Sequence, residues 1–311
     1  MVKITVLGSY NQDITMITPK IPRKKETISG AVMHLNPGGK GNNQANAAHK
    51  LGADVLLIAK IGKDPFGTSA IQHFKSAGMG TNGILQDEYY RTGTAMILVD
   101  EQSRENMIVV APGANHHISI EEVENLRIQI EASDICIFQF ENNLDAILHV
   151  MQIAYQVKKT IILNPAPMRH PFPKEVFKFV NILIMNEIEA ASISNQEVNS
   201  KETAIKAAKS IGKDRNLIAV ITLGGMGVVA WDGSKEYYHP SYKVEVKDTT
   251  GAGDAFIGAF SVEYGKSKNL SRSLKFASAT AAIKITRIGA SSGNPTLEEV
   301  TNFLEEREKN D

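Results

Sequence analysis

Six short apolar runs recur along the chain, and they constrain its fold more than any other feature of the sequence. They read VKITVLG, DVLLIAKIG, DICIFQF, TIILNP, NILIMN and LIAVITLGG, and most are apolar almost throughout. Strands covered on both faces have this composition. The segments between the runs, such as 41–51, 66–77, 119–131 and 142–157, place apolar residues at helical spacing. The alternation predicts an α/β fold, a doubly wound and mostly parallel sheet flanked by helices.

Two regions interrupt this alternation, residues 12–35 and residues 83–110. Both alternate apolar and polar residues between turn-forming residues, which is typical of antiparallel strands. We expect them to form a small β-sheet lid inserted in a single domain of residues 1–311, because no repeat, low-complexity tract or Pro-rich linker divides the chain. Three further segments have helical periodicity: 252–264, 270–287 and 296–308.

The charge balance and the cysteine count limit the partners and the compartment. Lys and Arg together number 34, as do Asp and Glu, so the chain has no net field that favours nucleic acid or an anionic membrane. Any anionic ligand must be bound locally. The single cysteine, Cys136, lies in a strand-like run and has no partner for a disulfide. With neither a long apolar leader nor a membrane-spanning run, the sequence predicts an unprocessed cytoplasmic protein.

The stretch DTTGAGDAFIGAF, residues 248–260, joins a glycine turn to an apolar-periodic helix. Gly251, Ala252 and Gly253 are expected to form a turn whose backbone amides open the helix, and exposed amides with the helix dipole make an anion site. Asp254 has two interpretations at this point. It stabilises the first helical turn by about 0.3–1 kcal/mol, or it acts chemically beside the anion site.

Two common nucleotide motifs are excluded by their spacing. A P-loop requires GxxxxGK[ST], and neither PGGKGNN nor DTTGAGD supplies it. GMGVVA nearly matches a dinucleotide fingerprint, but VVAWDG follows as a strand and turn instead of a helix. We therefore interpret TLGGMG, Thr222 to Gly227, as a glycine turn between strands against which a planar or phosphorylated ligand can lie.

A second glycine cluster, NPGGKGNNQANAAHKLG, precedes a helix that is expected to start near Asn42. Its glycines, with Lys40 and Asn43 at the mouth of the helix, suit a hydroxyl-rich ligand. Asn42 as a simple N-cap and Lys40 as a surface charge remain the structural alternative.

Polar side chains also follow several predicted strands. Asn11 and Asp13 follow the first strand, Glu141 follows the strand that ends at Phe140, and Asn186 and Glu189 follow NILIM. Each is unremarkable alone. Their shared position matters, because open α/β sheets bind ligands beyond the carboxyl ends of their strands.

The motifs GSYNQD, GGKGNNQA, LNPAP, NEIE, TLGGMG and DTTGAGDAFIGAF occur in this order, and together they resemble the ribokinase family of sugar kinases over essentially the whole chain. The resemblance implies ATP-dependent phosphorylation of D-ribose at its 5-hydroxyl, which gives ribose 5-phosphate and ADP. A kinase for another sugar, 2-deoxyribose or a hexose, is the nearest alternative. A non-catalytic sugar or nucleotide sensor on the same fold is the alternative of another class.

The resemblance also implies roles for individual residues. Asp254 corresponds to the catalytic base, and Gly251, Ala252 and Gly253 correspond to the anion hole. The positions that match sugar-contacting ones are Asn11, Asp13, Gly39, Lys40, Gly41, Asn43 and Glu141. The positions that match the nucleotide side are Asn186, Thr222, Leu223, Gly224, Gly225, Met226, Gly227, Gly253 and Ser278.

Two metal ions and a homodimer built through the lid are implied in the same way. Glu189 corresponds to a residue that organises Mg²⁺ through water. The positions that match an activating potassium site are Asp248, Thr250, Lys284, Arg287, Gly289 and Gly293. Three residues depart from the family pattern: Lys25 stands in the place of a glycine in the lid turn, Lys284 in the place of a small apolar residue beside the cation loop, and Ser278 in the place of a larger polar residue. We therefore expect an altered cation affinity.

Overall fold

The apolar runs form a nine-stranded sheet in the computed structural model, which describes residues 1–103 and 105–309. Every neighbouring pair from β11 to β5 is parallel, whereas β12 and β13 pair antiparallel at one edge. The mostly parallel sheet predicted from the sequence is confirmed. In spatial order the strands are β13 (Glu236–His239), β12 (Val228–Trp231), β11 (Ile218–Thr222), β10 (Ile182–Asn186), β9 (Thr160–Leu163), β8 (Ile135–Phe138), β1 (Lys3–Leu7), β4 (Asp54–Gly62) and β5 (Ile84–Asp87).

Helices cover both faces of this sheet, and each face has its own apolar cluster. The side chains of β1 alternate between the two clusters, with Ile4 and Val6 on one face and Leu7 on the other. The helices on the face of Ile4 are α1 (Lys40–Lys50), α2 (Pro65–Ser76), α8 (Ala252–Ser267), α9 (Leu270–Ile285) and α10 (Leu297–Glu308). Those on the face of Leu7 are α3 (Ile120–Glu124), α4 (Arg127–Glu131), α5 (Leu144–Gln156), α6 (Glu187–Ser194) and α7 (Lys201–Arg215). Three 3₁₀ turns complete the described elements: η1 (Gly113–His116), η2 (Lys174–Lys178) and η3 (Gly224–Met226).

Local sequence signals set several helix ends. Asp64 caps α2 by accepting a hydrogen bond from the Gly67 amide, and Pro65 fills its first position. Gly52 and Gly78 follow α1 and α2 with φ of 85° and 70°, as expected for glycines at helix C-termini. The helix expected over 119–131 is instead two short helices, α3 and α4, which are separated at Asn125 and Leu126.

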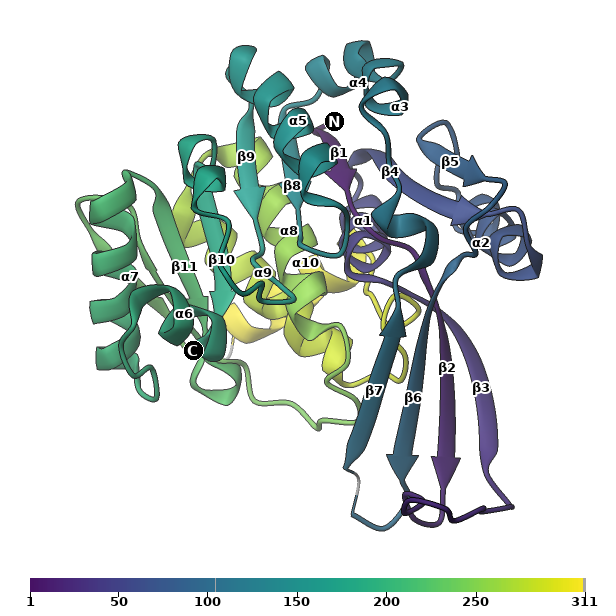
Figure 1. Cartoon of the computed structure of the whole chain (residues 1–311). Helices are drawn as coiled ribbons and strands as arrows, with labels where there is room; N and C mark the ends of the chain where they lie inside the picture. Colours follow the sequence, from purple (N-terminus) through teal and green to yellow (C-terminus); the bar gives the residue numbers. More distant parts are fainter. Residues whose placement is uncertain (104, 310–311) are drawn as a thin grey trace.

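A second sheet, of four strands in the described part of the chain, projects from the main body as the lid (Figure 1). Its hairpins β2–β3 and β6–β7 are antiparallel as expected, but the central β2–β6 pair is parallel, so the lid sheet is mixed. Lys25 has φ of 70° in the turn between β2 and β3, the left-handed conformation in which glycine is usual. The lid strands, in spatial order, are β3 (Val32–Gly38), β2 (Asn11–Thr18), β6 (Gly93–Asp100) and β7 (Asn106–Ala111).

The first part of the range 83–110 does not belong to the lid. β5 pairs with β4 at the edge of the large sheet, with Ile84 opposite Ala59. The buried ammonium of Lys60 pairs with Asp87 at the end of β5 and with Glu122 of α3, at 3.0 and 2.9 Å. Alternating polarity marks a half-covered strand in either sheet, so it predicts that a strand forms but not which sheet it joins.

Within the described residues, the helices are all too short or too polar to cross a lipid bilayer.

Candidate active site

The parallel strands carry the predicted site residues to one edge of the large sheet. Asn11 and Asp13 lie in β2, which follows β1 after three residues. Glu141 follows β8, Asn186 ends β10, and Thr222 ends β11. Because β1, β8, β10 and β11 run in the same direction, all these residues lie at the carboxyl edge, beside the base of the lid.

Asp254 is the third residue of α8, and its side chain is held from α1. The carboxylate is only 8% exposed, and it accepts hydrogen bonds from Asn43 Nδ2 at 3.0 Å and Gln44 Nε2 at 2.9 Å. Gln139, which follows β8, in turn donates to Gln44 Oε1 at 2.6 Å. Three elements distant in sequence therefore fix the orientation of this carboxylate, whereas an ordinary first-turn aspartate points into solvent. Gln44 and Gln139 were not among the predicted site residues.

The glycine turn before Asp254 leaves room for a ligand. Gly251 is the N-cap of α8 and has φ of 74°, a conformation suited to glycine. The Ala252 amide donates to the Thr249 carbonyl at 3.1 Å, whereas the Gly253 amide has no backbone acceptor among the described residues. A Cβ built on Gly253 would have no atom within 4 Å, so packing within the described protein does not explain the choice of glycine there. The free amide points to an anion at the positive end of the helix dipole.

The second glycine cluster opens α1, which begins at Lys40, two residues before the expected start. Gly39 is the N-cap with φ of 89°, and Gly41 packs on the backbone just after β1, where a Cβ would lie 2.4 Å from Gly8 Cα. Glu141 accepts a hydrogen bond from the Lys40 amide at 2.8 Å and another from the Ser9 hydroxyl. The carboxylate of Glu141 therefore occupies the N-terminus of this helix, where negative charge is favoured.

The lid supplies two more polar groups. The Asp13 carboxyl lies over Gly38, and a Cβ on that glycine would come within 2.1 Å of it. Burial raises the pKa of Asp13 from 3.8 to about 7, and the negative charges of Glu141 and Asp254 add to the rise.

Asn11 is oriented by a residue that the sequence did not indicate. Its Oδ1 accepts a hydrogen bond at 2.9 Å from Asn115, which also bonds to both backbone groups of Tyr10. Because Asn115 lies in the 3₁₀ turn η1, in a segment of ordinary polar composition, no sequence signal distinguished it.

Lys40 provides the positive charge among these carboxylates. The negative charge of Asp254 raises the pKa of Lys40 above its ordinary value, burial opposes the rise, and Glu141 and Glu189 add to it. Lys40 therefore remains protonated at neutral pH, within electrostatic reach of acids that come from three different elements.

The turn from Thr222 to Gly227 joins β11 to β12, as the sequence predicted. Its exposed part, η3, contains Gly225, on which a Cβ would meet no atom within 4 Å. Gly227 is required by packing, since a Cβ there would lie 2.2 Å from the His239 carbonyl oxygen. Leu223 is buried beneath the turn, Met226 is exposed beside it, and Ser278 lies half-buried on α9. The turn presents open backbone next to Asn186, its neighbour across the β10–β11 pair.

Residues 1–297 match the family model described as pfkB family carbohydrate kinase. The chain is 37% identical over 303 residues to a ribokinase of Haemophilus influenzae, and the match covers 97% of this chain and 98% of that one. It is 30% identical over 302 residues to a deoxyribokinase of Salmonella typhi, covering 97% and 98%. An Arabidopsis thaliana ribokinase solved with ribose and ATP has a similar fold, with a TM-score of 0.88, 26% identity and coverage of 98% and 99%.

The chain belongs to the pfkB carbohydrate kinase family. The expected family resemblance is thereby confirmed, and the chain is an enzyme, a sugar kinase of the ribokinase type. The lid and the doubly wound sheet are those of ribokinase structures.

The resemblance to sugar kinases implies that Glu189 organises Mg²⁺, and the groups that contact this residue test whether it can. Both carboxylate oxygens of this buried residue are engaged by Asn186, one by its amide N–H at 3.0 Å and the other by Nδ2 at 3.2 Å. No cluster of three acidic, His or Cys side chains suited to a metal occurs among the described residues. Mg²⁺ keeps several waters and binds substrate phosphates together with one or two carboxylates. Glu189 therefore fits an ion that it reaches through water.

The residues expected to form a potassium site lie in the loop before α8 (Asp248 and Thr250), in the last turn of α9 (Lys284) and in the loop between α9 and α10 (Arg287, Gly289 and Gly293). The Asp248 carboxylate accepts hydrogen bonds from the Thr250 amide at 2.9 Å and the Gly289 amide at 2.8 Å. Burial alone would raise the pKa of Asp248, but these hydrogen bonds and the nearby Lys284 hold it below its ordinary value. Arg287 is not part of the loop contacts, because it forms a bidentate pair with Glu299 of α10.

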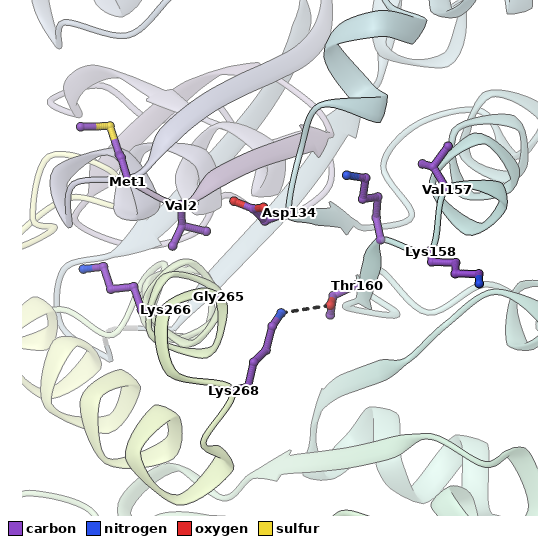
Figure 2. Close-up of a pocket in the computed structure, with 10 residues that line it drawn as sticks. Met1, Val2, Asp134, Val157, Lys158, Thr160, Gly265, Lys266 and Lys268 are labelled. Carbon is purple, nitrogen blue, oxygen red and sulfur yellow. Dashed lines mark hydrogen bonds between the residues drawn. The ribbon is translucent and has the colours of Figure 1, made fainter.

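A large hollow of about 640 Å³ lies at the opposite, amino edge of the sheet (Figure 2). Lysines surround it, and Lys268 reaches across it to the Thr160 hydroxyl at 3.3 Å. None of the predicted site residues lines it. Because ligands of open α/β sheets bind at the carboxyl edge, this hollow is not the active site of the pfkB kinase.

Proposed function

We propose that this kinase transfers the γ-phosphoryl group of ATP to the 5-hydroxyl of D-ribose and releases ribose 5-phosphate and ADP. One observation carries the proposal. The buried Asp254 carboxylate is held by two carboxamides of α1 directly beside a glycine turn with a free amide. A base fixed next to an anion site is the arrangement that phosphoryl transfer to an alcohol requires.

The base acts on the sugar hydroxyl. Asp254 takes the proton of the sugar 5-hydroxyl. The 5-oxygen bonds to the γ-phosphorus, and the bond from that phosphorus to the bridging oxygen of ADP breaks. Hydrogen bonds from Asn43 and Gln44 hold the carboxylate in one orientation, so little rearrangement precedes the proton transfer.

The sugar lies between α1 and the lid. Asp13 is expected to donate as well as accept hydrogen bonds, because a carboxyl group with a pKa of about 7 is half protonated at neutral pH. Asn11 and Asn43 offer carboxamides, and Glu141 and the Lys40 ammonium complete the polar surface. The backbone of Gly39 and Gly41 allows the sugar to approach α1 closely.

The phosphates lie over the turn of Gly251, Ala252 and Gly253. The Gly253 amide and the dipole of α8 stabilise the charge of the transferring group, while Lys40 lies within electrostatic reach of Asp254. Nucleotide contacts come from Asn186, from residues Thr222 to Gly227, and from Ser278. Glu189 would hold Mg²⁺ through water, and the ion would supply positive charge that neutralises the phosphates.

Replacement of Asp254 by Asn tests the base. We expect kcat in an ADP-release assay with D-ribose to fall by about 10²–10⁴-fold, because a carboxamide accepts no proton at neutral pH. Binding of ribose, measured by calorimetry, should persist. Asp145→Asn is the matched control, since Asp145 is also an acid in the first turn of a helix but is exposed. If Asp254→Asn keeps most of the wild-type kcat, Asp254 is not the base.

The choice between ribose and 2-deoxyribose depends on Asn11, because the relatives include ribokinases and deoxyribokinases. Asn11, fixed by Asn115, favours ribose if its carboxamide faces the 2-hydroxyl, since loss of that hydroxyl would leave a buried polar group unpaired. A larger kcat/KM for 2-deoxyribose than for ribose would replace the substrate but not the mechanism. Binding of ribose and ATP with no ADP formed would favour a sensor instead.

We also propose that two copies of the chain associate through their lids. Large apolar side chains are exposed on three of the lid strands, and on β7 four consecutive ones are exposed, with Val109 72% exposed. Consecutive residues of a strand point to opposite faces, so the enclosed sugar site covers at most one of the two faces. A second lid is the partner whose apolar surface matches by symmetry.

A further inference from the structure

A buried lysine lies beneath the two loops that flank the glycine turn. Lys284, in the last turn of α9, is 0% exposed, and its ammonium donates a hydrogen bond to the Asp248 carbonyl oxygen at 3.1 Å. Burial lowers the pKa of Lys284 below its ordinary value, and the negative charges of Asp248 and Asp254 oppose this fall. An ammonium taken out of water needs such acceptors and opposite charges to remain charged.

The contacts of Lys284 belong to a set that ties the two loops together. The amides of Lys247 and Asp248 donate to the Ile285 carbonyl, at 2.8 and 3.2 Å, and the Asp248 carboxylate binds the Gly289 amide. Gly293 passes directly over the lysine, since a Cβ on it would lie 3.4 Å from Lys284 Cε. The loops close over the lysine stem, and the loop that contains Asp248 leads directly into the turn of Gly251.

The same atoms determine whether a potassium ion fits. Potassium is bound by carbonyl oxygens, and here the Asp248 carbonyl already accepts a hydrogen bond from an ammonium. A potassium ion on that oxygen would place a second positive charge beside the buried ammonium of Lys284, and the two charges would repel each other. Arg287, which matches another position of the cation site, is turned to Glu299. The described residues do not fit a monovalent cation.

We propose that the Lys284 ammonium is a built-in cation that holds the two loops, and through them the glycine turn, so that this kinase works without added potassium. Lys284 is a positioning residue, because it acts through Asp248 and the turn and touches no reacting atom. The part of the proposal that concerns turnover rests on the proposed kinase function, whereas the part that concerns loop stability does not.

The first test uses the unmodified enzyme. Turnover with D-ribose and MgATP is compared in about 100 mM potassium chloride and in tetramethylammonium chloride of the same ionic strength. We expect rates that differ by less than about twofold, and thermal unfolding midpoints that potassium does not raise above the value in sodium. Activation of about tenfold or more by potassium, or a rise of the midpoint that is specific to potassium, would overturn the proposal.

The second test removes the ammonium. Lys284→Ala should lose about tenfold or more in kcat in tetramethylammonium, and potassium or methylammonium should restore much of it by entering the space left. Its unfolding midpoint should rise with potassium in parallel. Lys275→Met is the control, because Lys275 lies on the same helix but pairs with Glu308 at the surface. A Lys284→Ala enzyme as active as wild type without potassium would refute the assigned role.

The two measurements separate the failures. If the chain phosphorylates no sugar in either salt, the proposed function fails. The unfolding midpoints of wild type and Lys284→Ala, with and without potassium, still determine whether Lys284 replaces the ion.

Discussion

Replacement of Asp13 by Asn should stabilise the ligand-free enzyme, and more so at alkaline pH. The carboxyl of Asp13 is largely buried at the base of the lid, and the charges of Glu141 and Asp254 oppose its ionisation. An asparagine has nearly the same shape and no charge. The substitution therefore removes a penalty that the folded protein bears only when Asp13 is ionised.

The size of the effect follows from the shifted pKa. Because the pKa of Asp13 in the folded protein is raised from 3.8 to about 7, the stability contributed by the protonated carboxyl is fully present below pH 3.8 and is lost as the pH rises to about 7. Between pH 5 and pH 8, the free energy of unfolding falls over the 7 − 5 = 2 pH units below this pKa, which amounts to about 3 kcal/mol at most. Water entry and relaxation reduce such penalties, so we expect about 1–3 kcal/mol, or about 2–6 °C in Tm.

Thermal unfolding of wild type and Asp13→Asn at pH 5 and pH 8, without ligand, measures the effect. The increase in Tm from wild type to Asp13→Asn should be larger at pH 8 than at pH 5, by about 2–6 °C. Asp145→Asn corrects for the change in net charge, because Asp145 is exposed. An equal gain at both pH values would refute the reasoning, since Asp13 would then ionise normally in the folded enzyme. The stabilised variant should also bind ribose more weakly.

Three other substitutions test separate parts of the site. Gly253→Ala should raise Tm slightly, because alanine favours a helix by about 1 kcal/mol over glycine. The added methyl group should crowd the phosphate and lower kcat in the ADP-release assay, and an unchanged kcat would contradict the assignment of the anion hole. Gln44→Ala should reduce kcat by about tenfold with little change in the calorimetric Kd for ribose, and a change in Kd alone would contradict its role in orienting Asp254. Val109→Glu should give monomers in sedimentation velocity, while wild-type monomers would contradict association through the lid.

The sequence predicted the large sheet well because that prediction depends on local patterns. Runs such as DICIFQF are apolar almost throughout, and this indicates a strand covered on both faces wherever it occurs. The prediction that β5 belongs to the lid was wrong, because the composition of this strand is compatible with either sheet. Which sheet it joins depends on pairing with β4 and on the charges of Asp87 and Lys60, which lie far apart in sequence.

Some residues of the candidate site could be selected from the sequence, whereas others could be found only in the folded structure. Position after a strand made Asn11 and Glu141 candidates, and the glycine turn that opens a helix made Asp254 one. Gln44 and Gln139 could not be selected, because glutamines on a helix and after a strand are ordinary. Only the folded chain brings Gln44 to Asp254, 210 positions away, and Gln139 to Gln44, 95 positions away.

Lys284 shows a third limit of sequence reasoning. Its departure from the family pattern predicted an altered cation affinity. That its ammonium bonds to the Asp248 carbonyl depends on how the loops close, which no periodicity encodes.

The central claim is that Asp254 receives the proton of the sugar 5-hydroxyl beside a phosphoryl group bound at the glycine turn. A crystal structure of the wild-type enzyme with D-ribose, Mg²⁺ and a non-hydrolysable ATP analogue tests it most directly. The account predicts the 5-hydroxyl oxygen within about 2.6–3.2 Å of the Asp254 carboxylate and the γ-phosphate against the Gly253 amide. A sugar bound with its 5-hydroxyl turned away from Asp254, or a γ-phosphate distant from the glycine turn, would contradict it.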